Sequence, residues 1–300
     1  MLSFIDIIFS QKYLELDKLN VNLWKFWKQK TQFMGLLEAI GNLHIINVVL
    51  CALIGVVFTL WFIPRILVVS FKKKLFDFAD ERKVHTGVVP RLGGVAFVPS
   101  ILISVSLMAG ISSLVLPGDA NVFVVPTLQM AFGLCSLILL YFEGIMDDLV
   151  GLRYRVKFVI QILCALLIVA SGIWLNDFHG LFGLAGLSPW FGVPFSVLLV
   201  VFIINAINLI DGIDGLASGL SIVSAFFFGI MFCYEGYWGF AMLAFSLMGT
   251  LVPFFYYNVF GDAQKRRKIF MGDTGSQCVG LILSVLAIRL SMTLPDEQPK

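Results

Sequence analysis

Residues 191–217 read FGVPFSVLLVVFIINAINLIDGIDGLA, an apolar run that ends in regularly spaced polar residues. The part from 191 to 210 is long enough for a helix to cross the roughly 30 Å hydrocarbon core of a bilayer. Polar side chains then recur at every third position, at Asn205, Asn208, Asp211 and Asp214. Such groups are costly at the end of an apolar span unless they are satisfied. They predict either hydrogen bonds between helices or a polar site at the membrane surface.

The rest of the chain has the same character. Of its 300 residues, 59% are hydrophobic and 13% are charged, whereas soluble proteins carry about 25% charged residues. We predict an all-α fold, a polytopic transmembrane helix bundle of about eight spans near 45–71, 95–116, 122–142, 158–175, 191–210, 216–234, 238–257 and 278–294. Residues 1–43 are interpreted as an amphipathic, interfacial extension, and residues 44–300 as one transmembrane domain.

Lysine and arginine in the short loops predict the orientation of the bundle. The loops 71–94, 147–157 and 258–277 are basic, whereas 117–121, 176–190 and 235–237 contain no lysine or arginine. The basic loops, and with them residues 205–215, are therefore placed on the cytoplasmic side. A formal net charge of +2 is too small to indicate nucleic acid as a partner.

A pair of carboxylates, Asp147 and Asp148, ends the third span. Adjacent carboxylates repel unless cations or a metal ion neutralise them. Adjacent residues of a helix point about 100° apart, so we favour Asp147 as the one that faces a site. The alternative is a solvated helix end neutralised by the basic residues that follow.

Glycine and hydroxyl residues open the last span, in Phe270-Met-Gly-Asp-Thr-Gly-Ser276. The free N–H groups of a helix N-terminus can cradle phosphate, and Asp273 is placed to reach that phosphate through Mg²⁺. A simple helix cap is the alternative. The basic, turn-rich segment 82–94 is a candidate for binding a diphosphate or an anionic lipid headgroup. The alternative is that its basic residues only reflect the excess of lysine and arginine that cytoplasmic loops normally carry.

Together these clusters indicate cation-assisted phosphoryl transfer, in which Mg²⁺ and basic groups hold a nucleotide diphosphate and a membrane-borne phosphate attacks it. A phosphomonoester has its second pKa near 6, so it is mostly a dianion at neutral pH and a general base has little to do. Positioning and charge neutralisation should dominate.

Four motifs in this order resemble the polyprenyl-phosphate N-acetylhexosamine-1-phosphate transferases of glycosyltransferase family 4. The motifs are His85 with Pro90-Arg-Leu-Gly-Gly94, Asp147-Asp148, Asn205–Ala217 and Phe270–Ser276. The resemblance covers about residues 45–294. It implies a bundle of ten or eleven helices in the bacterial cytoplasmic (inner) membrane, with its active site on the cytoplasmic face.

The resemblance also implies roles for individual residues. Asp147 is the family's proposed base or nucleophile at the lipid phosphate. We predict catalytic carboxylates at Asp147, Asp148, Asp211 and Asp214. We predict substrate or phosphate contacts from His85, Arg91, Asn205, Asn208, Gly272, Thr274 and Ser276. The expected ligands of Mg²⁺, with Mn²⁺ as an alternative, are Asp273, Asn208 and Asp211.

The implied reaction is transfer of N-acetylhexosamine 1-phosphate, chiefly GlcNAc 1-phosphate, from a UDP-sugar to undecaprenyl or another polyprenyl phosphate. It releases UMP and begins the membrane stage of cell-envelope polysaccharide synthesis. The Pro90–Gly94 sequence looks like the GlcNAc-type branch. The alternatives are a phospho-MurNAc-pentapeptide transferase, an ion-coupled transporter and an inactive scaffold, and a homodimer is an open alternative to a monomer.

One departure from the family pattern concerns its histidine-rich cytoplasmic loop. The chain has three histidines, and none follows His179. We therefore expect the C-terminal part of the family fold to be missing, and the 300 residues alone to be weakly active or inactive.

Overall fold

The computed structural model describes residues 43–75, 89–115, 127–180 and 186–292. The described residues from 47 onward belong to one compact unit. Within the described ranges every regular element is helical, as predicted. In chain order the elements are the helix Leu43–Lys73, the 3-10 turn η1 (Gly93–Ala96), α2 (Phe97–Val115), α3 (Thr127–Val150), α4 (Tyr154–Ala170), α5 (Pro189–Ile210), α6 (Leu216–Tyr234), α7 (Trp238–Val259) and α8 (Gly272–Leu290).

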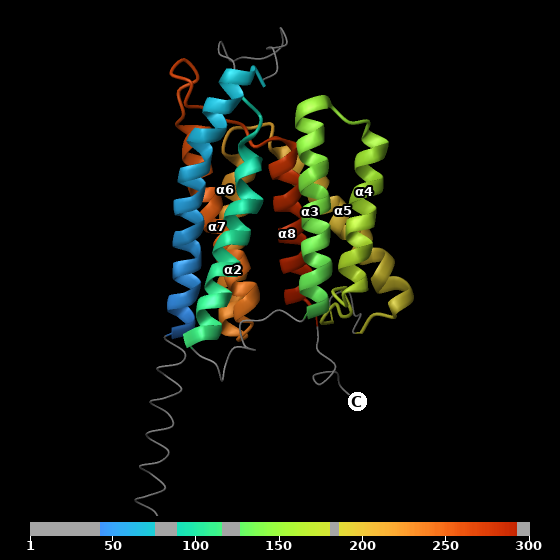
Figure 1. Cartoon of the computed structure of the whole chain (residues 1–300). Coiled ribbons are helices and arrows are strands. Elements are labelled where there is room, and N and C mark those ends of the chain that lie inside the picture. Colours follow the sequence, from blue (N-terminus) through green and yellow to red (C-terminus); the bar gives the residue numbers. More distant parts are fainter. Residues whose placement is uncertain (1–42, 76–88, 116–126, 181–185, 293–300) are drawn as a thin grey trace, which may run out of the picture. The chain divides into compact units, whose positions relative to one another are not determined.

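Seven of the described helices are long and apolar enough to cross a membrane. The span expected near 158–175 corresponds to α4, which has 17 residues and is shorter than each of those seven. It ends at Ala170 because a turn follows, with Gly172 at φ +91°. Figure 1 shows α4 running back alongside α3, and it also contacts α5. The chain path is therefore the one expected for eight successive spans.

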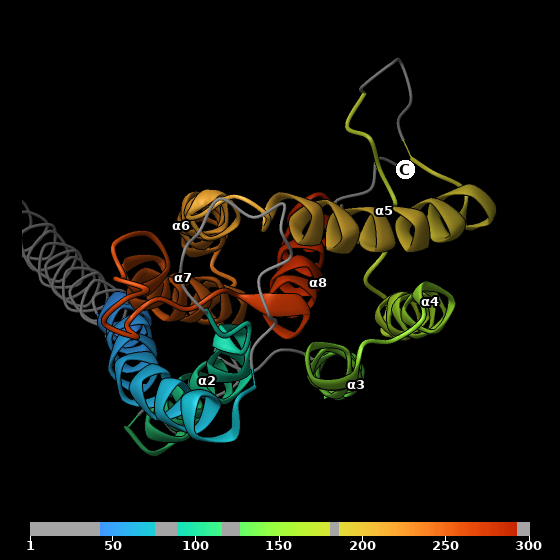
Figure 2. The same cartoon turned by 90° about the horizontal axis from the view of Figure 1, so that it is seen from above.

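Helix α8 is the centre of the bundle, with contacts to α3, α5, α6, α7 and η1 (Figure 2). Of the apolar 18-residue stretch of α8, 78% is buried inside the protein. Only 17% of the corresponding stretch of α5 is buried. Its first half, Gly272–Gly280, is rich in glycine, serine and threonine, and small residues let membrane helices approach closely. The polar residues of α8 consequently face protein and not lipid.

The close approach of α3 to the start of α8 depends on Gly144. A Cβ atom on Gly144 would lie 2.4 Å from Thr274 Cα, so a larger residue would push the two helices apart. This contact brings the last two turns of α3 against the first turn of α8.

Candidate active site

Two of the sequence motifs are joined by backbone hydrogen bonds. Phe270 N–H donates to Pro90 O at 2.9 Å, Gly93 N–H to Phe270 O at 2.9 Å and Gly94 N–H to Met271 O at 2.8 Å. The segment 90–94 therefore lies along the entry to α8. Arg91 is exposed there, and its charge acts on Asp211. His85 lies outside the described residues, so its predicted role stays a prediction.

Asp148 binds the N-terminus of α8. Its carboxylate accepts hydrogen bonds from Asp273 N–H at 2.8 Å, from Thr274 N–H at 3.0 Å and from the Thr274 hydroxyl at 2.5 Å. Gly272, at φ +76°, has no room for a side chain, because a Cβ atom would lie 2.7 Å from both Asp148 carboxylate oxygens. A carboxylate at this position satisfies free N–H groups and complements the helix dipole.

This arrangement gives partners to groups for which phosphate contacts were predicted. The N–H groups of Asp273 and Thr274 were expected to be free for phosphate, but Asp148 already occupies them. The buried Thr274 hydroxyl is also engaged with Asp148. Asp148 is therefore placed to cap and stabilise α8, and the predicted phosphate contacts of Gly272, Thr274 and Ser276 stay predictions.

We expect Asp148→Ala to destabilise the protein, because the start of α8 would lose its capping carboxylate. The expected cost is about 1–2 kcal/mol, or a decrease of roughly 3–6 °C in Tm for a bundle of this size. Thermal unfolding in detergent measures it. Asp262→Ala is the matched control, since the Asp262 side chain contacts Gln264 and Lys265 of its own exposed loop in the described structure. An unchanged Tm for Asp148→Ala would contradict the capping role.

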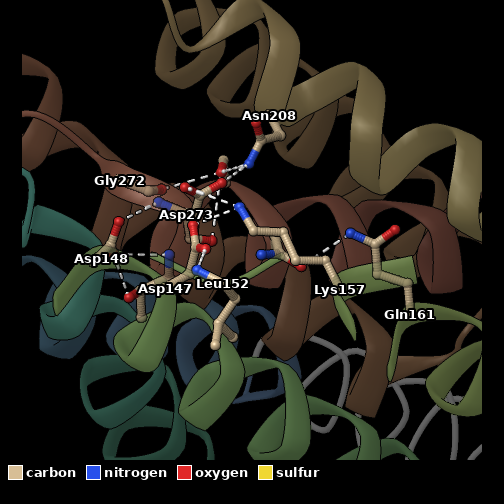
Figure 3. A network of polar contacts seen from close by, with 11 residues as sticks. Asp147, Asp148, Leu152, Lys157, Gln161, Asn208, Gly272 and Asp273 are labelled. Carbon is tan, nitrogen blue, oxygen red and sulfur yellow. Dashed lines mark hydrogen bonds and ion pairs between the residues drawn. The ribbon is translucent and has the colours of Figure 1, made fainter. Parts of the chain in front are cut away.

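A second set of side chains, from four helices, meets at the same end of the bundle (Figure 3). Lys157 Nζ on α4 lies 2.5 Å from Asp147 Oδ2 on α3 and 3.5 Å from Asp273 Oδ2 on α8. Asn208 Nδ2 on α5 donates to Asp273 Oδ1, and to Ser276 Oγ at 3.1 Å. We call Asp147, Lys157, Asn208 and Asp273 the site layer.

The two carboxylates of the site layer differ in their freedom to bind a ligand. Both oxygens of Asp147 are engaged, Oδ1 by Leu152 N–H at 2.7 Å and Oδ2 by Lys157, and its side chain is 8% exposed. The Asp273 side chain is 26% exposed. Asp273 is thus the more accessible carboxylate, and Asp147 holds Lys157 in place.

Asp211, directly after α5, also lies in this region, close enough to Asp273, Asp148 and Arg91 for their charges to act on it. Burial raises the pKa of its carboxyl group to about 8, and the nearby negative charge of Asp273 adds to the effect. The cost of burying the charged form thus outweighs the stabilising charge of Arg91. A bound cation would favour the charged form of Asp211.

The other predicted residues have different partners. Asp214 forms an ion pair with Lys268 at 2.5 Å, in a loop region where Gly215 N–H also donates to Asn258 Oδ1 at 2.7 Å. Asn205 donates to Gln161 Oε1 at 2.7 Å, so its side chain is turned toward α4, one helical turn away from Asn208. The Ser276 hydroxyl is buried and donates to Gly272 O at 3.0 Å.

Sequence reasoning missed Lys157, which it treated only as one of several positive charges in a basic loop. It also missed two buried polar residues, Gln161 and Gln277. The available signal was their position, because each is a polar residue within or beside an apolar helical run, where polar groups need a partner or a function.

The donor atoms at this end of the bundle suit a hard cation. Among the described residues no group of three His, Cys, Asp or Glu side chains is arranged to hold a metal ion. Mg²⁺, however, is usually bound through one or two carboxylates together with substrate phosphates and water. Asp273, Asn208 and Asp211 have side-chain oxygen atoms of that kind.

Comparison with known proteins agrees with the resemblance drawn from the motifs. The family described as "Glycosyl transferase family 4" matches residues 130–291, more than half of the chain. A Bacillus subtilis (strain 168) protein named "Probable undecaprenyl-phosphate N-acetylglucosaminyl 1-phosphate transferase" is 33% identical over 255 residues, which is 84% of this chain and 66% of that protein.

Two other relatives represent the two branches considered above. The undecaprenyl-phosphate alpha-N-acetylglucosaminyl 1-phosphate transferase of Salmonella typhimurium (strain LT2) is 32% identical over 239 residues, 77% of this chain and 59% of that protein. The phospho-N-acetylmuramoyl-pentapeptide-transferase of Listeria monocytogenes is 28% identical over 232 residues, which is 76% of this chain and 69% of that protein.

The chain spans about six tenths to two thirds of the length of the N-acetylglucosaminyl 1-phosphate transferases that it matches. Its apolar helices and its bacterial relatives together make it a multi-pass membrane protein. The family match includes α3, α4, α5 and α8, the four helices that build the site layer. The chain therefore belongs to glycosyl transferase family 4.

Proposed function

We propose that the protein transfers N-acetylhexosamine 1-phosphate, with GlcNAc 1-phosphate preferred, from a UDP-sugar to undecaprenyl or another polyprenyl phosphate and releases UMP. The observation that carries the proposal is the site layer, in which an accessible carboxylate, a lysine and an amide meet at one end of a membrane bundle. The names of the Bacillus and Salmonella relatives support both the acceptor and the transferred group.

We propose that Asp273, Asn208 and Asp211 hold Mg²⁺ through their oxygen atoms, with Mn²⁺ as a substitute. When bound, the ion would neutralise charge on the diphosphate of the donor. Lys157, held between Asp147 and Asp273, is positioned to bind a phosphate oxygen as a point charge. The exposed Arg91 provides a further positive charge beside Asp211.

The bond changes of this reaction are simple. A phosphate oxygen of the lipid attacks the sugar-bound β-phosphorus of the donor, and the bond from that phosphorus to the bridging oxygen breaks. UMP leaves with the bridging oxygen and both electrons of the broken bond. Because the lipid phosphate is mostly a dianion at neutral pH, no proton has to be removed from it. The residues of the site then act by positioning and by charge stabilisation.

The proposed location is the bacterial cytoplasmic membrane, with the site layer at its cytoplasmic surface. The basic connections that flank the site, 147–157 and 258–277, support this orientation by the positive-inside rule. The connection between α3 and α4 and the start of α8 lie at the same end of the bundle (Figure 1). A UDP-sugar made in the cytoplasm would reach that side directly.

A donor panel tests the proposal. Membranes that contain the protein are incubated with polyprenyl phosphate and UDP-GlcNAc, UDP-GalNAc or UDP-MurNAc-pentapeptide, and the lipid products are identified by mass spectrometry. We expect a lipid carrying GlcNAc and a second phosphate, with a yield at least about a hundredfold lower in EDTA. A product from UDP-MurNAc-pentapeptide alone would favour the pentapeptide branch, and no product from any donor would favour the inactive scaffold.

A further inference from the structure

A second polar layer lies one helical turn from the site layer, toward the middle of the membrane. It has one side chain from each of the same four helices, α3, α4, α5 and α8: Glu143, Gln161, Asn205 and Gln277. Each is three or four residues, one turn of helix, from a member of the site layer on its own helix. Figure 3 shows the relation on α4, where Gln161 follows Lys157. We call these four residues the inner layer.

Three side-chain amides of the inner layer form a chain of hydrogen bonds, in which the nitrogen of each amide donates to the oxygen of the next. Asn205 Nδ2 donates to Gln161 Oε1 at 2.7 Å, and Gln161 Nε2 donates to Gln277 Oε1 at 3.1 Å. The chain links α5 to α4 and α4 to α8. Its last amide nitrogen, Gln277 Nε2, belongs to a side chain that interacts with Glu143 on α3. Hydrogen bonds in such a chain polarise one another, so the donor end is well suited to a carboxylate.

The end of the chain is incompletely satisfied. Glu143 is 4% exposed and Gln277 is fully buried, yet neither the Glu143 oxygens nor Gln277 Nε2 form a hydrogen bond of good geometry. Among charged groups, Lys157 acts on Glu143 most strongly. A buried polar pair with unsatisfied atoms does little for stability, and apolar residues of similar size would serve packing at least as well.

From these observations we propose that Glu143 and Gln277 are positioning residues. They hold Lys157 and Asn208 of the site layer in place from one helical turn closer to the middle of the membrane. Glu143 attracts the Lys157 ammonium group from the membrane side, opposite to any phosphate bound at the surface. The amide chain keeps α4 and α5, and therefore Lys157 and Asn208, at a constant spacing from Asp273 on α8. The effect on transfer rests on the proposed function, whereas the effect on Lys157 itself does not.

The decisive variant is the double substitution Glu143→Leu with Gln277→Leu, which replaces the polar pair by apolar residues of similar size. We expect its Tm to stay close to that of the parent, because the unsatisfied atoms of the pair are gone while Gln161 Nε2 loses its acceptor, Gln277 Oε1. We expect kcat to fall about tenfold or more through misplacement of Lys157 and Asn208. KM for the UDP-sugar should stay within about twofold, because the inner layer does not reach the donor.

A second measurement is independent of transfer. Lys157 is labelled with an amine-acetylating reagent at one fixed pH, and mass spectrometry compares it with Lys265, whose side chain is 74% exposed. In the parent Lys157 is 23% exposed and held by two carboxylates, so it should react slowly. In the double variant we expect its labelling relative to Lys265 to rise about fivefold as the side chain is released.

Ser104→Ala is the matched control, because Ser104 and Ser246 form another buried polar pair, at 2.5 Å between α2 and α7. It should change neither kcat nor the labelling of Lys157. An inner-layer double variant that is folded, and that keeps the parent's kcat and Lys157 labelling, overturns the inference. A parent that transfers no sugar phosphate counts against the proposed function alone, and the labelling ratio then decides the inference.

Discussion

Asp273→Asn is expected to lower the rate of sugar-phosphate transfer about a thousandfold. Asp273 is the accessible carboxylate of the site layer, and Asn208 and Lys157 both converge on it. Asparagine keeps the size and one oxygen atom of the side chain but removes its negative charge. A divalent cation that brings the donor diphosphate to the site would lose its main anionic ligand.

The fold should survive this substitution. Asp273 lies close to Asp147 and Asp211, and removing one of several neighbouring negative charges relieves repulsion. We expect Tm to be unchanged or higher in the absence of Mg²⁺. UMP release from radiolabelled UDP-GlcNAc, expressed relative to the parent, measures the effect even where the parent's own rate is low.

Asp262→Asn is the matched control, because Asp262 lies in an exposed loop and pairs with Lys265. Its rate should equal that of the parent. If Asp273→Asn kept more than about a tenth of the parent's rate, the assignment of Asp273 as principal metal ligand would be wrong.

Lys157→Met is expected to lower kcat about a hundredfold. Methionine has a similar length and flexibility but no charge, so it leaves Asp147 and Asp273 without the ammonium group that lies between them. The negative charge of the lipid phosphate would then meet only carboxylates on that side. Unlike the inner-layer double variant, Lys157→Met should also raise the apparent KM for the phosphate acceptor.

Two further variants separate charge from shape at this position. Lys157→Arg keeps the charge and should recover part of the rate, although the planar guanidinium group does not fit a site built around a compact ammonium. Lys265→Met removes an exposed lysine from another basic loop and should leave kcat unchanged. Equal losses in Lys157→Met and Lys265→Met would show that only the overall positive charge of the loops matters.

The motifs read from the sequence came together in the structure to different degrees. Asp147, Asn208, Asp211 and Asp273 all face one end of the bundle, as the spacing of their motifs implied. Asp148 was grouped with Asp147 because the two are adjacent in sequence, yet it binds the start of α8. Asn205 was grouped with Asn208, yet it is bonded to Gln161 one turn away. Spacing of three residues predicted a shared helix face but not which partner each side chain would meet.

The sequence by itself determined that this is a helical membrane protein and predicted which of its segments hold the candidate site residues. Both conclusions rest on local properties, because a bilayer requires about 20 apolar residues for each spanning helix and penalises every polar group placed among them. Tertiary structure alone decided the partners of Asp148 and Lys157 and the existence of the inner layer. Those depend on how each helix is rotated about its own axis, and that rotation is set by contacts between distant segments, such as Gly144 against Thr274.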